Sequence, residues 1–339
     1  MYFRFTFLLL FMKILYAIQG TGNGHLCRAM DVIPCLQAFG EVDVLISGIQ
    51  ADICIPFDIK YRLHGLSFIF GKSGGVDLWK TFMSSTVRKL LQEINEVPVQ
   101  DYDLVINDFE PITAWACQTK DLPCIGLSHQ IGAMHPDSPK PDETDMMGKF
   151  IMKNYAPVTQ AYGFHFKQYH HSIFTPVIRE PIRSLEPTNE GHYTVYLPSY
   201  DDAHLLKQLT KFTDVNWEVF SKHNTKPLHM KNVKIQPINN DAFVKSMASS
   251  EGVLCGAGFE TPAEALYLGK KVLAIPMKNQ YEQHLNAAAL EDIGVPVIKS
   301  LKKKYEYDIE LWLNSTDTVK VDYRNNTMQI VETIINKNT

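Results

Sequence analysis

One stretch of the sequence decides the fold, and it reads Gly252-Val253-Leu254-Cys255-Gly256-Ala257-Gly258-Phe259-Glu260-Thr261-Pro262-Ala263-Glu264-Ala265-Leu266. The run 252–255 is short and apolar, which is typical of a strand buried in a parallel sheet. A glycine-containing turn follows it, and Pro262 suits the first position of a helix. Because Val272–Ile275 is again a short apolar run, the stretch predicts a strand, turn, helix and second parallel strand.

The same alternation runs through both halves of the chain, on either side of the polar, turn-rich segment Glu186–Gly191. The sequence therefore predicts an α/β fold with two Rossmann-like, doubly wound parallel-sheet domains that face each other across a cleft. Helices are expected at Leu26–Phe39, Trp79–Ile94 and Trp115–Thr119 of the N-terminal half. Besides the two strands above, strands are expected at Ile14–Ile18, Val42–Ile46, Tyr102–Ile106, Pro123–Leu127, Tyr193–Leu197, Trp217–Phe220 and Val233–Ile235.

The domain boundaries follow from this division of the 339 residues. We expect an N-terminal domain over 12–185, a C-terminal domain over 191–320, and a last helix over 321–339 for which packing back on the first domain is one option. Met134–Glu143 is polar and Pro-rich, which predicts a long surface loop beside the site. With 45% hydrophobic residues, the chain has enough apolar material for two separate cores.

Composition limits the classes of function. The formal net charge of −4 and the pI near 6.3 provide no basic field that would recruit nucleic acid. Six scattered cysteines without a C-x-x-C pair favour reduced thiols and hence the cytosol. The apolar run Phe7–Met12 is too short to span a bilayer, which needs about 20 apolar residues, and we interpret it as a non-native start with Met12 as initiator.

The first motif, Gly20-x-Gly22-x-Gly24-His25, follows a strand and opens a helix. Its glycines allow a tight turn and a close backbone approach to a ligand, while the helix N-terminus favours an anion. A dinucleotide site is disfavoured, because the third glycine is displaced and the second strand ends in Ser47-Gly48 without a carboxylate. A purely structural turn remains an alternative. The residues expected at the cleft are Gly22, Asn23 and Gly24.

The pair Gly71-Lys72, followed by Ser73, resembles the end of a P-loop. A P-loop requires a glycine five positions before the Gly-Lys pair, and that position is Leu66. A loop that lines the cleft is the better interpretation of this segment.

The second motif is the turn after strand 252–255. Its amides and the following helix start suit a diphosphate. Glu264 has two interpretations: it closes a capping box with Thr261, or its carboxylate accepts hydrogen bonds from ribose hydroxyls. Downstream, Glu282-Gln283 lie where open α/β sheets bind ligands, and a carboxylate with an amide suits sugar hydroxyls. A solvated helix start is the alternative for that pair.

These residues resemble the donor-binding signature of the GT-B glycosyltransferases. Gly258, the run Thr261–Leu266, Gly269-Lys270, Pro276 and the ending Glu282-Gln283-x-x-Asn286-Ala287 occur in the order of that signature. The Gly20–His25 loop is similar to that of the family 28 branch, which includes the enzyme that adds N-acetylglucosamine to the lipid-linked peptidoglycan precursor. The two motifs lie in the two predicted domains, and much of the chain between them matches only in its rhythm.

The resemblance implies an inverting glycosyltransferase that uses a nucleotide diphosphate sugar, with uridine as the first choice of base. The first domain would bind the acceptor and the second the donor, with His25 near the reacting centre. Two departures are Glu260, an acid where a small or apolar residue is commoner, and Leu197-Pro198-Ser199-Tyr200, which lacks the usual glycines. We expect Glu260 to point away from the phosphates or to select against some donor. The implied donor-binding residues are Gly256, Ala257, Gly258, Phe259, Thr261, Glu264, Glu282 and Gln283.

Transfer to a hydroxyl requires a base, and four candidates follow strands of the first domain. They are His25, Asp108, Glu110 and His129. His25 is the preferred base because imidazole titrates near neutral pH, and Asp108 is either the base itself or the group that orients His25. Membership of a buried structural network is the alternative for Asp108 and His129.

No metal site and no cofactor beyond the co-substrate are expected. The Asp-x-Asp pattern at Asp101 and Asp103 precedes its strand and so lies at the wrong edge of the sheet. The histidines His165, His170 and His171 lack an i, i+4 pair and are interpreted as surface or packing residues.

Two other functions remain open at this point, a nucleotide-sugar epimerase on the same fold and a non-catalytic sugar-nucleotide-binding protein. The acceptor is unknown, and a lipid-linked one is an option together with peripheral contact to the inner face of the membrane. The aromatic-rich stretch Phe150–Phe174 would suit such contact, although a helix packed in the first domain is the favoured interpretation.

Overall fold

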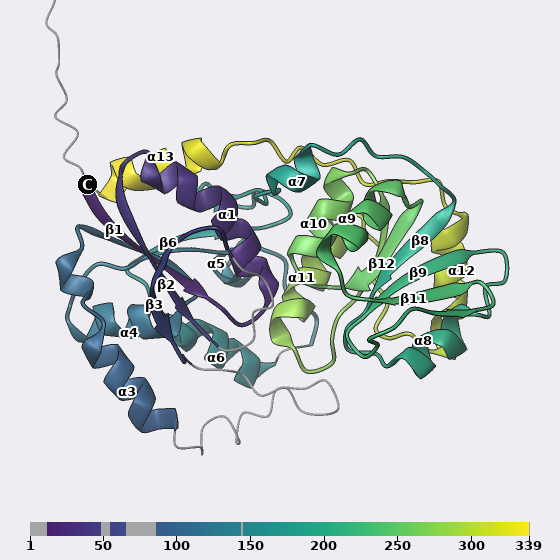
Figure 1. Cartoon of the computed structure of the whole chain (residues 1–339), viewed down its shortest axis with the longest axis horizontal. Helices are drawn as coiled ribbons and strands as arrows, with labels where there is room; N and C mark the ends of the chain where they lie inside the picture. Colours follow the sequence, from purple (N-terminus) through teal and green to yellow (C-terminus); the bar gives the residue numbers. More distant parts are fainter. Residues whose placement is uncertain (1–11, 49–54, 66–85, 144, 339) are drawn as a thin grey trace, which may run out of the picture.

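The structure is a computed structural model that describes residues 12–48, 55–65, 86–143 and 145–338 (Figure 1). Three predictions lie wholly or partly outside these residues. They concern the apolar run Phe7–Met12 apart from Met12 itself, the loop at Gly71-Lys72-Ser73, and the part of the expected helix Trp79–Ile94 that precedes Thr86.

The N-terminal half is built on a parallel sheet of seven strands in the order β3-β2-β1-β4-β5-β6-β7. The chain moves outward from β1 to β3 and then returns to the other side of β1, so a switch point lies between β1 and β4, where open sheets bind their ligands. The strands are β1 (Met12–Gln19), β2 (Gly40–Ser47), β3 (Ile59–Leu63), β4 (Leu104–Asp108), β5 (Ile125–Ser128), β6 (Gln160–Phe164) and β7 (Ile173–Phe174).

Helices cover both faces of this sheet because its central strands are apolar on both sides. In β1, Ile14, Tyr16 and Ile18 point to one face and Leu15 and Ala17 to the other, and all five are fully buried. The connecting helices are α1 (Asn23–Gln37), α3 (Thr86–Glu96), the short 3₁₀ helix η1 (Val99–Asp101), α4 (Pro111–Thr119), α5 (His129–Met134), α6 (Met146–Tyr155) and α7 (Glu180–Arg183).

The C-terminal half has a second sheet, with the strand order β10-β11-β9-β8-β12-β13. All its neighbouring strands are parallel except β10 and β11. Its strands are β8 (His192–Tyr196), β9 (Asn216–Ser221), β10 (Leu228–Met230), β11 (Val233–Pro237), β12 (Gly252–Gly256) and β13 (Lys271–Ile275). Its helices are α8 (Asp202–Leu209), α9 (Asn240–Ser249), α10 (Glu260–Tyr267), α11 (Tyr281–Asp292), η2 (Lys303–Tyr305) and α12 (Glu306–Asn314).

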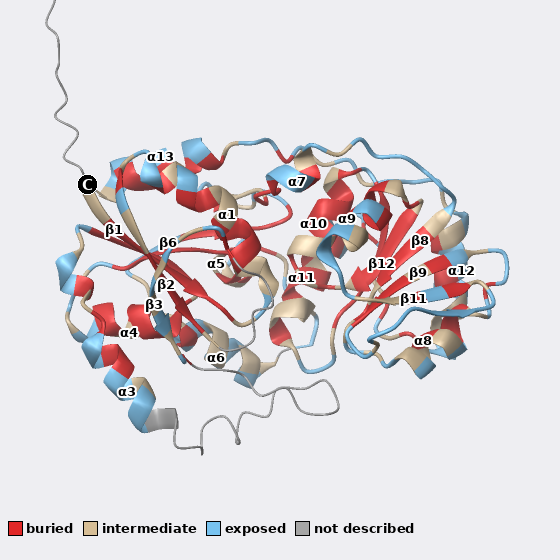
Figure 2. Cartoon of the chain, in the orientation of Figure 1, coloured by how far each residue is buried: buried red, intermediate tan, exposed pale blue. Residues whose placement is uncertain are grey.

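The two sheets are separate, but the cores are not. One cluster of buried apolar side chains runs from β1 and α1 into α10 and β12 of the second half, so the prediction of two separate cores is wrong. Figure 2 shows buried residues in red along these four elements. The last helix, α13 (Thr327–Asn338), packs its buried face, with Ile330 and Ile334, against α1 of the first half. The chain thus crosses between the halves twice, which restricts how far they move apart.

All nine strands expected from apolar runs are present, with ends shifted by up to two residues. Four further strands, β3, β6, β7 and β10, were not expected, because their sequences are short or polar. The prediction of a helix over the stretch Phe150–Phe174 is wrong beyond Tyr155, where β6 and β7 follow. Among the described residues, no helix is both long and apolar enough to cross a membrane.

Helix α5, which carries His129, packs closely against β6. A Cβ atom added to Gly132 of α5 would lie 2.1 Å from the carbonyl oxygen of Phe164, and one added to Gly163 of β6 would lie 2.3 Å from the backbone nitrogen of Gly132. Only glycine fits at these two positions, so they fix the depth at which α5 is seated.

We therefore predict that Gly132→Ala destabilises the protein by about 3 kcal/mol, because the new methyl group meets a backbone oxygen that has no room to move. Urea unfolding followed by circular dichroism measures the loss. Gly258→Ala is the matched control for stability, since no atom lies within 4 Å of the Cβ position there. Equal stability of Gly132→Ala and the unmodified chain would contradict this packing.

Candidate functional site

Three polar side chains come together at the carboxyl ends of β1, β4 and β5. His25 lies in the first turn of α1, which follows β1, and Asp108 is the last residue of β4. Because β1 and β4 are neighbours in which Ile18 pairs with Asp108, the imidazole and the carboxylate lie on the same edge of the sheet. Gln130 reaches the same place from α5.

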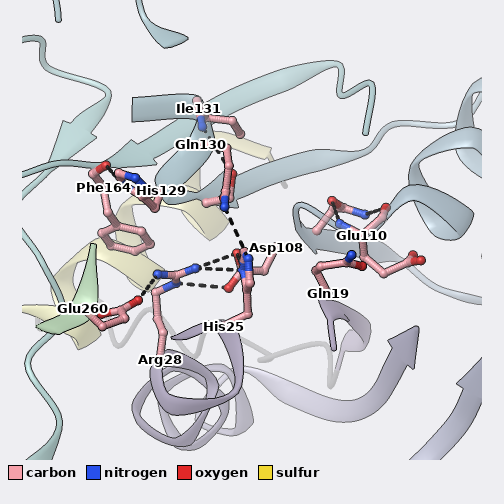
Figure 3. A network of polar contacts seen from close by, with 12 residues as sticks. Gln19, His25, Arg28, Asp108, Glu110, His129, Gln130, Ile131, Phe164 and Glu260 are labelled. Atoms are coloured by element: carbon pink, nitrogen blue, oxygen red, sulfur yellow. Dashed lines mark hydrogen bonds and ion pairs between the residues drawn. The ribbon is translucent and has the colours of Figure 1, made fainter. Parts of the chain in front are cut away.

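His25 and Asp108 form a hydrogen-bonded pair. The imidazole Nδ1 lies 2.8 Å from Asp108 Oδ1. Since an ionised carboxylate only accepts hydrogen bonds, Nδ1 carries the proton and Nε2 carries the lone pair when the ring is neutral. The amide nitrogen of Gln130 lies 3.3 Å from Nε2, as Figure 3 shows. Orientation of a histidine by a carboxylate on one nitrogen is the arrangement of a general base, and an acceptor hydroxyl would take the place of Gln130 at the other nitrogen.

Arg28 completes the network from the same face of α1, three residues after His25. Its Nε and Nη2 donate to the two oxygens of Asp108 at 3.0 and 2.8 Å. Burial raises the pKa of the Asp108 carboxyl, but Arg28 and His25 outweigh burial and hold the pKa below its usual value. Asp108 is fully buried and surrounded by these donors, so it is placed to orient His25 rather than to reach a substrate.

A cavity of about 470 Å³ opens beside His25 and lies between the two halves. Glu282, in the first turn of α11, lines it from the second half, and Phe109 lines it from the first. Phe109 has a φ of 57°, in the left-handed region that a bulky side chain rarely adopts, and such strain is often found at functional sites. The lining residues are Gln19, Thr21, His25, Phe109, Gln130, Asp145, Met147, Gly148, Ile151, Met152, Asn279, Gln280, Tyr281 and Glu282.

The predicted donor turn lies between β12 and α10, outside the residues that line this cavity. The amide of Ala257 already donates to the carbonyl of Ile275 at 3.2 Å, so it is not available to a phosphate. A Cβ at Gly258 would meet nothing within 4 Å, which leaves open space above that residue, whereas Gly256 lies beside Gln283. Thr261 is half-buried in the first turn of α10.

Glu264 does not form the capping box that its spacing from Thr261 suggests. Helix α10 has no side-chain cap bond, and both oxygens of Glu264 accept from Arg179, at 2.6 Å from Nε and 3.0 Å from Nη2. Arg179 immediately precedes α7, and both side chains are less than one-tenth exposed. The capping interpretation is therefore wrong, and the carboxylate is held instead by a buried ion pair.

Two residues expected to face the cleft do not face it. Glu110 is fully buried and caps α4, because its oxygens accept from the amides of Ile112 at 2.7 Å and Thr113 at 2.6 Å. His129 is buried too, with Nε2 at 2.7 Å from Asn286 Oδ1 and its ring stacked 3.8 Å from that of Phe259. Glu110 and His129 are structural residues, and the pair of His129 and Phe259 joins the two halves.

The other predicted residues take mixed positions. Gln283 uses its carbonyl oxygen to accept from the amide of Met277 at 2.8 Å. Gly22 caps α1 with a φ of 96°, a conformation that favours glycine, and Asn23 is the first residue of that helix. Gly24 lies against Glu260, whose Cγ would be 3.0 Å from an added Cβ. The turn at 20–25 thus packs against α10 of the other half.

The sequence interpretation missed Arg28, Arg179 and Gln130. A signal existed for Arg28, since residues three apart share one face of a helix and Arg28 follows His25 at that spacing. Gln130 directly follows His129 after a strand end, but nothing marked it above its neighbour. No signal existed for Arg179, which lies 85 positions from Glu264 in a segment without a motif.

One group of side chains has the composition of a metal site. Ligand atoms of His135, Asp137 and His170 lie within 4.8 Å of one another. However, Nδ1 of His135 lies 3.2 Å from the amide of Asp137, and Nδ1 of His170 lies 3.2 Å from that of Ser172. Backbone N–H groups thus occupy both Nδ1 lone pairs, so a neutral ring keeps its proton on Nε2, and we assign no metal to this group. The described cysteines are Cys27, Cys35, Cys117, Cys124 and Cys255, and all five are free thiols.

Comparison with known proteins assigns the chain to a family. A family model described as glycosyl transferase family 1 matches residues 12–314, which span both halves and the whole network around His25. The chain belongs to glycosyl transferase family 1. No match was found among curated protein sequences.

Solved structures show the same fold at low sequence identity. LpCGTa in complex with UDP is similar with a TM-score of 0.63 and 14% identity, over 97% of this chain and 99% of that one. MurG of Acinetobacter baumannii is similar with a TM-score of 0.56 and 13% identity, over 96% and 99% of the two chains. The spinosyn forosaminyltransferase SpnP is similar with a TM-score of 0.56 and 13% identity, over 97% of this chain and 96% of that one.

These structures are GT-B glycosyltransferases, so the predicted architecture is confirmed. The predicted resemblance is confirmed as well, since MurG belongs to the family 28 branch. The family 1 chain is thus a glycosyltransferase, built from two parallel-sheet domains. Its identity to each of these structures is too low to transfer a substrate.

The charge on Asp108 yields a pH-dependent prediction. Its folded-state pKa is lowered, so the carboxylate stabilises the fold above its usual pKa of 3.8 and loses that contribution as pH falls through the lowered value. At neutral pH, Asp108→Asn should cost about 3 kcal/mol, because it leaves the buried Arg28 without a carboxylate beside it. The difference from the unmodified chain should shrink on acidification.

Urea unfolding at pH 7, 3.5 and 2.5 measures both effects, because the contribution of the carboxylate is lost only below 3.8. Asp214→Asn, at an exposed position, is the control and should match the unmodified chain at each pH. A cost of Asp108→Asn at pH 2.5 that is as large as the cost at pH 7 would show that the charge of Asp108 does not stabilise the fold.

Proposed function

We propose that this glycosyltransferase moves a sugar from a UDP-sugar to a hydroxyl acceptor with inversion at the anomeric carbon, and that His25 is the base. The observation that carries the proposal is that His25 and Glu282, which come from different halves, line one cavity. A group that activates an acceptor and a group suited to sugar hydroxyls therefore lie where a transfer reaction needs them.

The proton transfer follows from the tautomer of His25. As the acceptor oxygen attacks the anomeric carbon, its proton passes to the Nε2 lone pair, and the bond from that carbon to the diphosphate oxygen breaks. Asp108, at 2.8 Å from Nδ1, stabilises the imidazolium that forms. One displacement without an enzyme nucleophile inverts the anomeric configuration, in line with the inverting family 28 branch that the Gly20–His25 loop resembles.

The donor would lie along the second half, with its diphosphate above Gly258 and its sugar near Glu282 and Gln283. The open space at Gly258 allows close backbone approach, and the N-terminus of α10 is attractive to an anion. UDP is the nucleotide named in the complex of LpCGTa, which shares the fold. Charge on the leaving diphosphate would be met by amides and the helix dipole, so we propose that no cofactor takes part.

The acceptor should carry an apolar body beside its hydroxyl. Phe109, Ile151 and Met152 line the cavity, and burial raises the pKa of Glu282 at its far side. Helix α6 extends this apolar surface to the outside, since Met147 and Phe150 are more than half exposed. A lipid-linked or aromatic hydroxyl compound fits this lining better than a free sugar does, so both classes belong in an acceptor screen.

We predict that His25→Ala still binds UDP but loses transfer by about 1,000-fold, since a general base contributes about 10²- to 10⁴-fold. Binding is measured by the thermal shift with UDP, for which a ligand at 100 times its dissociation constant adds about 2.7 kcal/mol. Transfer is measured as UDP release from a panel of UDP-sugars and acceptors.

His229→Ala, an exposed position on β10, is the control for His25→Ala. UDP binding without turnover across the panel, in the unmodified chain, would support a non-catalytic sugar-nucleotide-binding protein. Conversion of one UDP-sugar into another without an acceptor would support an epimerase. Full transfer by His25→Ala would refute the assignment of the base.

A separate prediction concerns Glu264, which the resemblance assigns to the donor ribose. Glu264→Gln should remove the UDP-dependent thermal shift, because an amide no longer offers two acceptor oxygens to the ribose hydroxyls. In the structure Arg179 donates to both of these oxygens, so a ribose hydroxyl must replace Arg179 at one of them or share it. An undiminished shift in Glu264→Gln would leave this residue with the ion pair to Arg179 as its only role.

A further inference from the structure

Glu260 is the acidic residue in the donor turn that departs from the family pattern, and the structure gives it a partner in the other half. It is the first residue of α10, and its Oε1 accepts from Arg28 Nη1 at 2.6 Å. The side chain of Glu260 is one-fifth exposed and that of Arg28 is almost fully buried. The contact joins residues 232 positions apart across the boundary between the halves.

The packing around this contact leaves little freedom. Gly24 lies directly against Glu260, and an added Cβ would be 3.0 Å from its Cγ and 3.5 Å from its Oε1. The guanidinium of Arg28 also lies over the ring of Phe164, 5.3 Å from its centroid. Glu260 therefore packs tightly against the first turn of α1. Figure 3 shows the contact of its carboxylate with Arg28.

The other nitrogens of Arg28 contact Asp108 and His25, the pair that would carry out the proposed proton transfer. Its Nε and Nη2 donate to Asp108, and Nη2 lies 3.1 Å from His25 Nδ1. Because Nδ1 carries a proton that points to Asp108, this last approach is a contact between two donors and opposes a positive charge on the ring. Glu260 lies at the opposite end of the same guanidinium and offsets its charge.

The charge balance around His25 therefore depends on Glu260. With Glu260 ionised, one guanidinium lies between two carboxylates, and a proton on His25 brings the group of four to zero net charge. With a neutral residue at position 260, the same proton would leave the group with a net positive charge in a buried place. Glu260 thus favours the imidazolium that forms when His25 accepts a proton.

We propose that Glu260 is a positioning residue: through Arg28 it sets the charge around Asp108 and His25, and so makes His25 an effective base only when α10 is seated against α1. The inference rests on the proposed role of His25. It places control of the base in the donor-side half, so that the base is fully active only when the two halves are joined.

The titration of Glu260 provides a signature that packing alone would not produce. Burial raises the pKa of Glu260 to about 7, with Arg28 opposing the rise. Among the described residues, the other charged groups near His25 are Asp108 on β4, Arg28 on α1 and Glu282 on α11. Glu264 and Arg179 also act on Glu260. Gln130 faces the ring from α5 and is uncharged. Burial raises the pKa of Glu282 as well, so Glu260 and Glu282 are the two carboxyls to be distinguished by substitution.

The test is a titration of the His25 ring by ¹⁵N NMR in histidine-labelled protein between pH 5.5 and 8.5, with signals assigned from His25→Ala. In the unmodified chain, the His25 signals should report the titration of Glu260 near pH 7. Glu260→Gln should lack that step, and Glu282→Gln should keep it. Ring signals of Glu260→Gln that follow the unmodified chain throughout would overturn the inference.

Asp292→Asn is the matched control, because it weakens another contact between the halves without touching the network of His25. Asp292 on α11 accepts from Tyr169 at 2.9 Å and pairs with Lys167 at 3.5 Å. Its His25 titration should equal that of the unmodified chain. If the same change appeared in Asp292→Asn, loosening of the halves alone would explain it and the role of Glu260 would be refuted.

The NMR readout does not require transfer, so it separates this inference from the proposed function. Where transfer is detected, Glu260→Gln should lower kcat by about 10-fold at pH 8.5 with little change in KM for the UDP-sugar, and should approach the unmodified chain at pH 5.5, where Glu260 is protonated. Equal kcat at both values of pH would contradict the inference even if His25 proved to be the base.

Discussion

The buried carboxylate of Asp108 is the constraint on which the rest of the site depends. A buried charge is tolerated only when it is paired and hydrogen-bonded, and Asp108 obtains its two basic partners, His25 and Arg28, from one helix, α1. His25 and Arg28 occupy one face of that helix, and the glycines of the preceding turn let α1 start close to the sheet. Arg28 in turn requires a second acceptor, which Glu260 supplies from the other half.

This requirement explains why the two halves are joined by more than apolar packing. Arg28 with Glu260 and Arg179 with Glu264 cross between the halves, and the stacked rings of His129 and Phe259 lie between them. The residues next to the expected diphosphate therefore already have partners in the first half. In the proposed site, donor binding and the contact between the halves share the carboxylate of Glu264, so each would influence the other.

Sequence patterns predicted much of the architecture because it follows from short-range regularities. Apolar runs such as Ile14–Ile18 and Val272–Ile275 marked the central strands, and the glycine turns marked the edges where ligands bind. Edge strands such as β10 were missed, because a strand of three residues is too short to show a pattern of its own. The spacing of apolar residues shows which side of a helix or strand is buried, but it does not show that one core continues from the first sheet to the second.

The site was predicted where chemistry follows from position on one element, and missed where it depends on contacts between distant segments. The order of β1 and β4 in a doubly wound sheet was enough to bring His25 near Asp108. Glu264 was assigned to a helix cap or to a ribose because its partner Arg179 is distant in sequence. Glu110 was placed in the cleft because, in the sequence, a glutamate that caps a helix after a strand has the same position as one that faces a ligand. Long-range ion pairs carry no local signal.

A crystal structure with a hydrolysis-resistant UDP-sugar analogue tests most directly whether the crevice between the halves is the place of transfer. We expect the diphosphate above Gly258, the sugar beside Glu282, and Nε2 of His25 on the face of the anomeric carbon opposite the leaving oxygen. A nucleotide bound elsewhere, or a sugar turned away from His25, would contradict the proposed site and with it the role of the buried network.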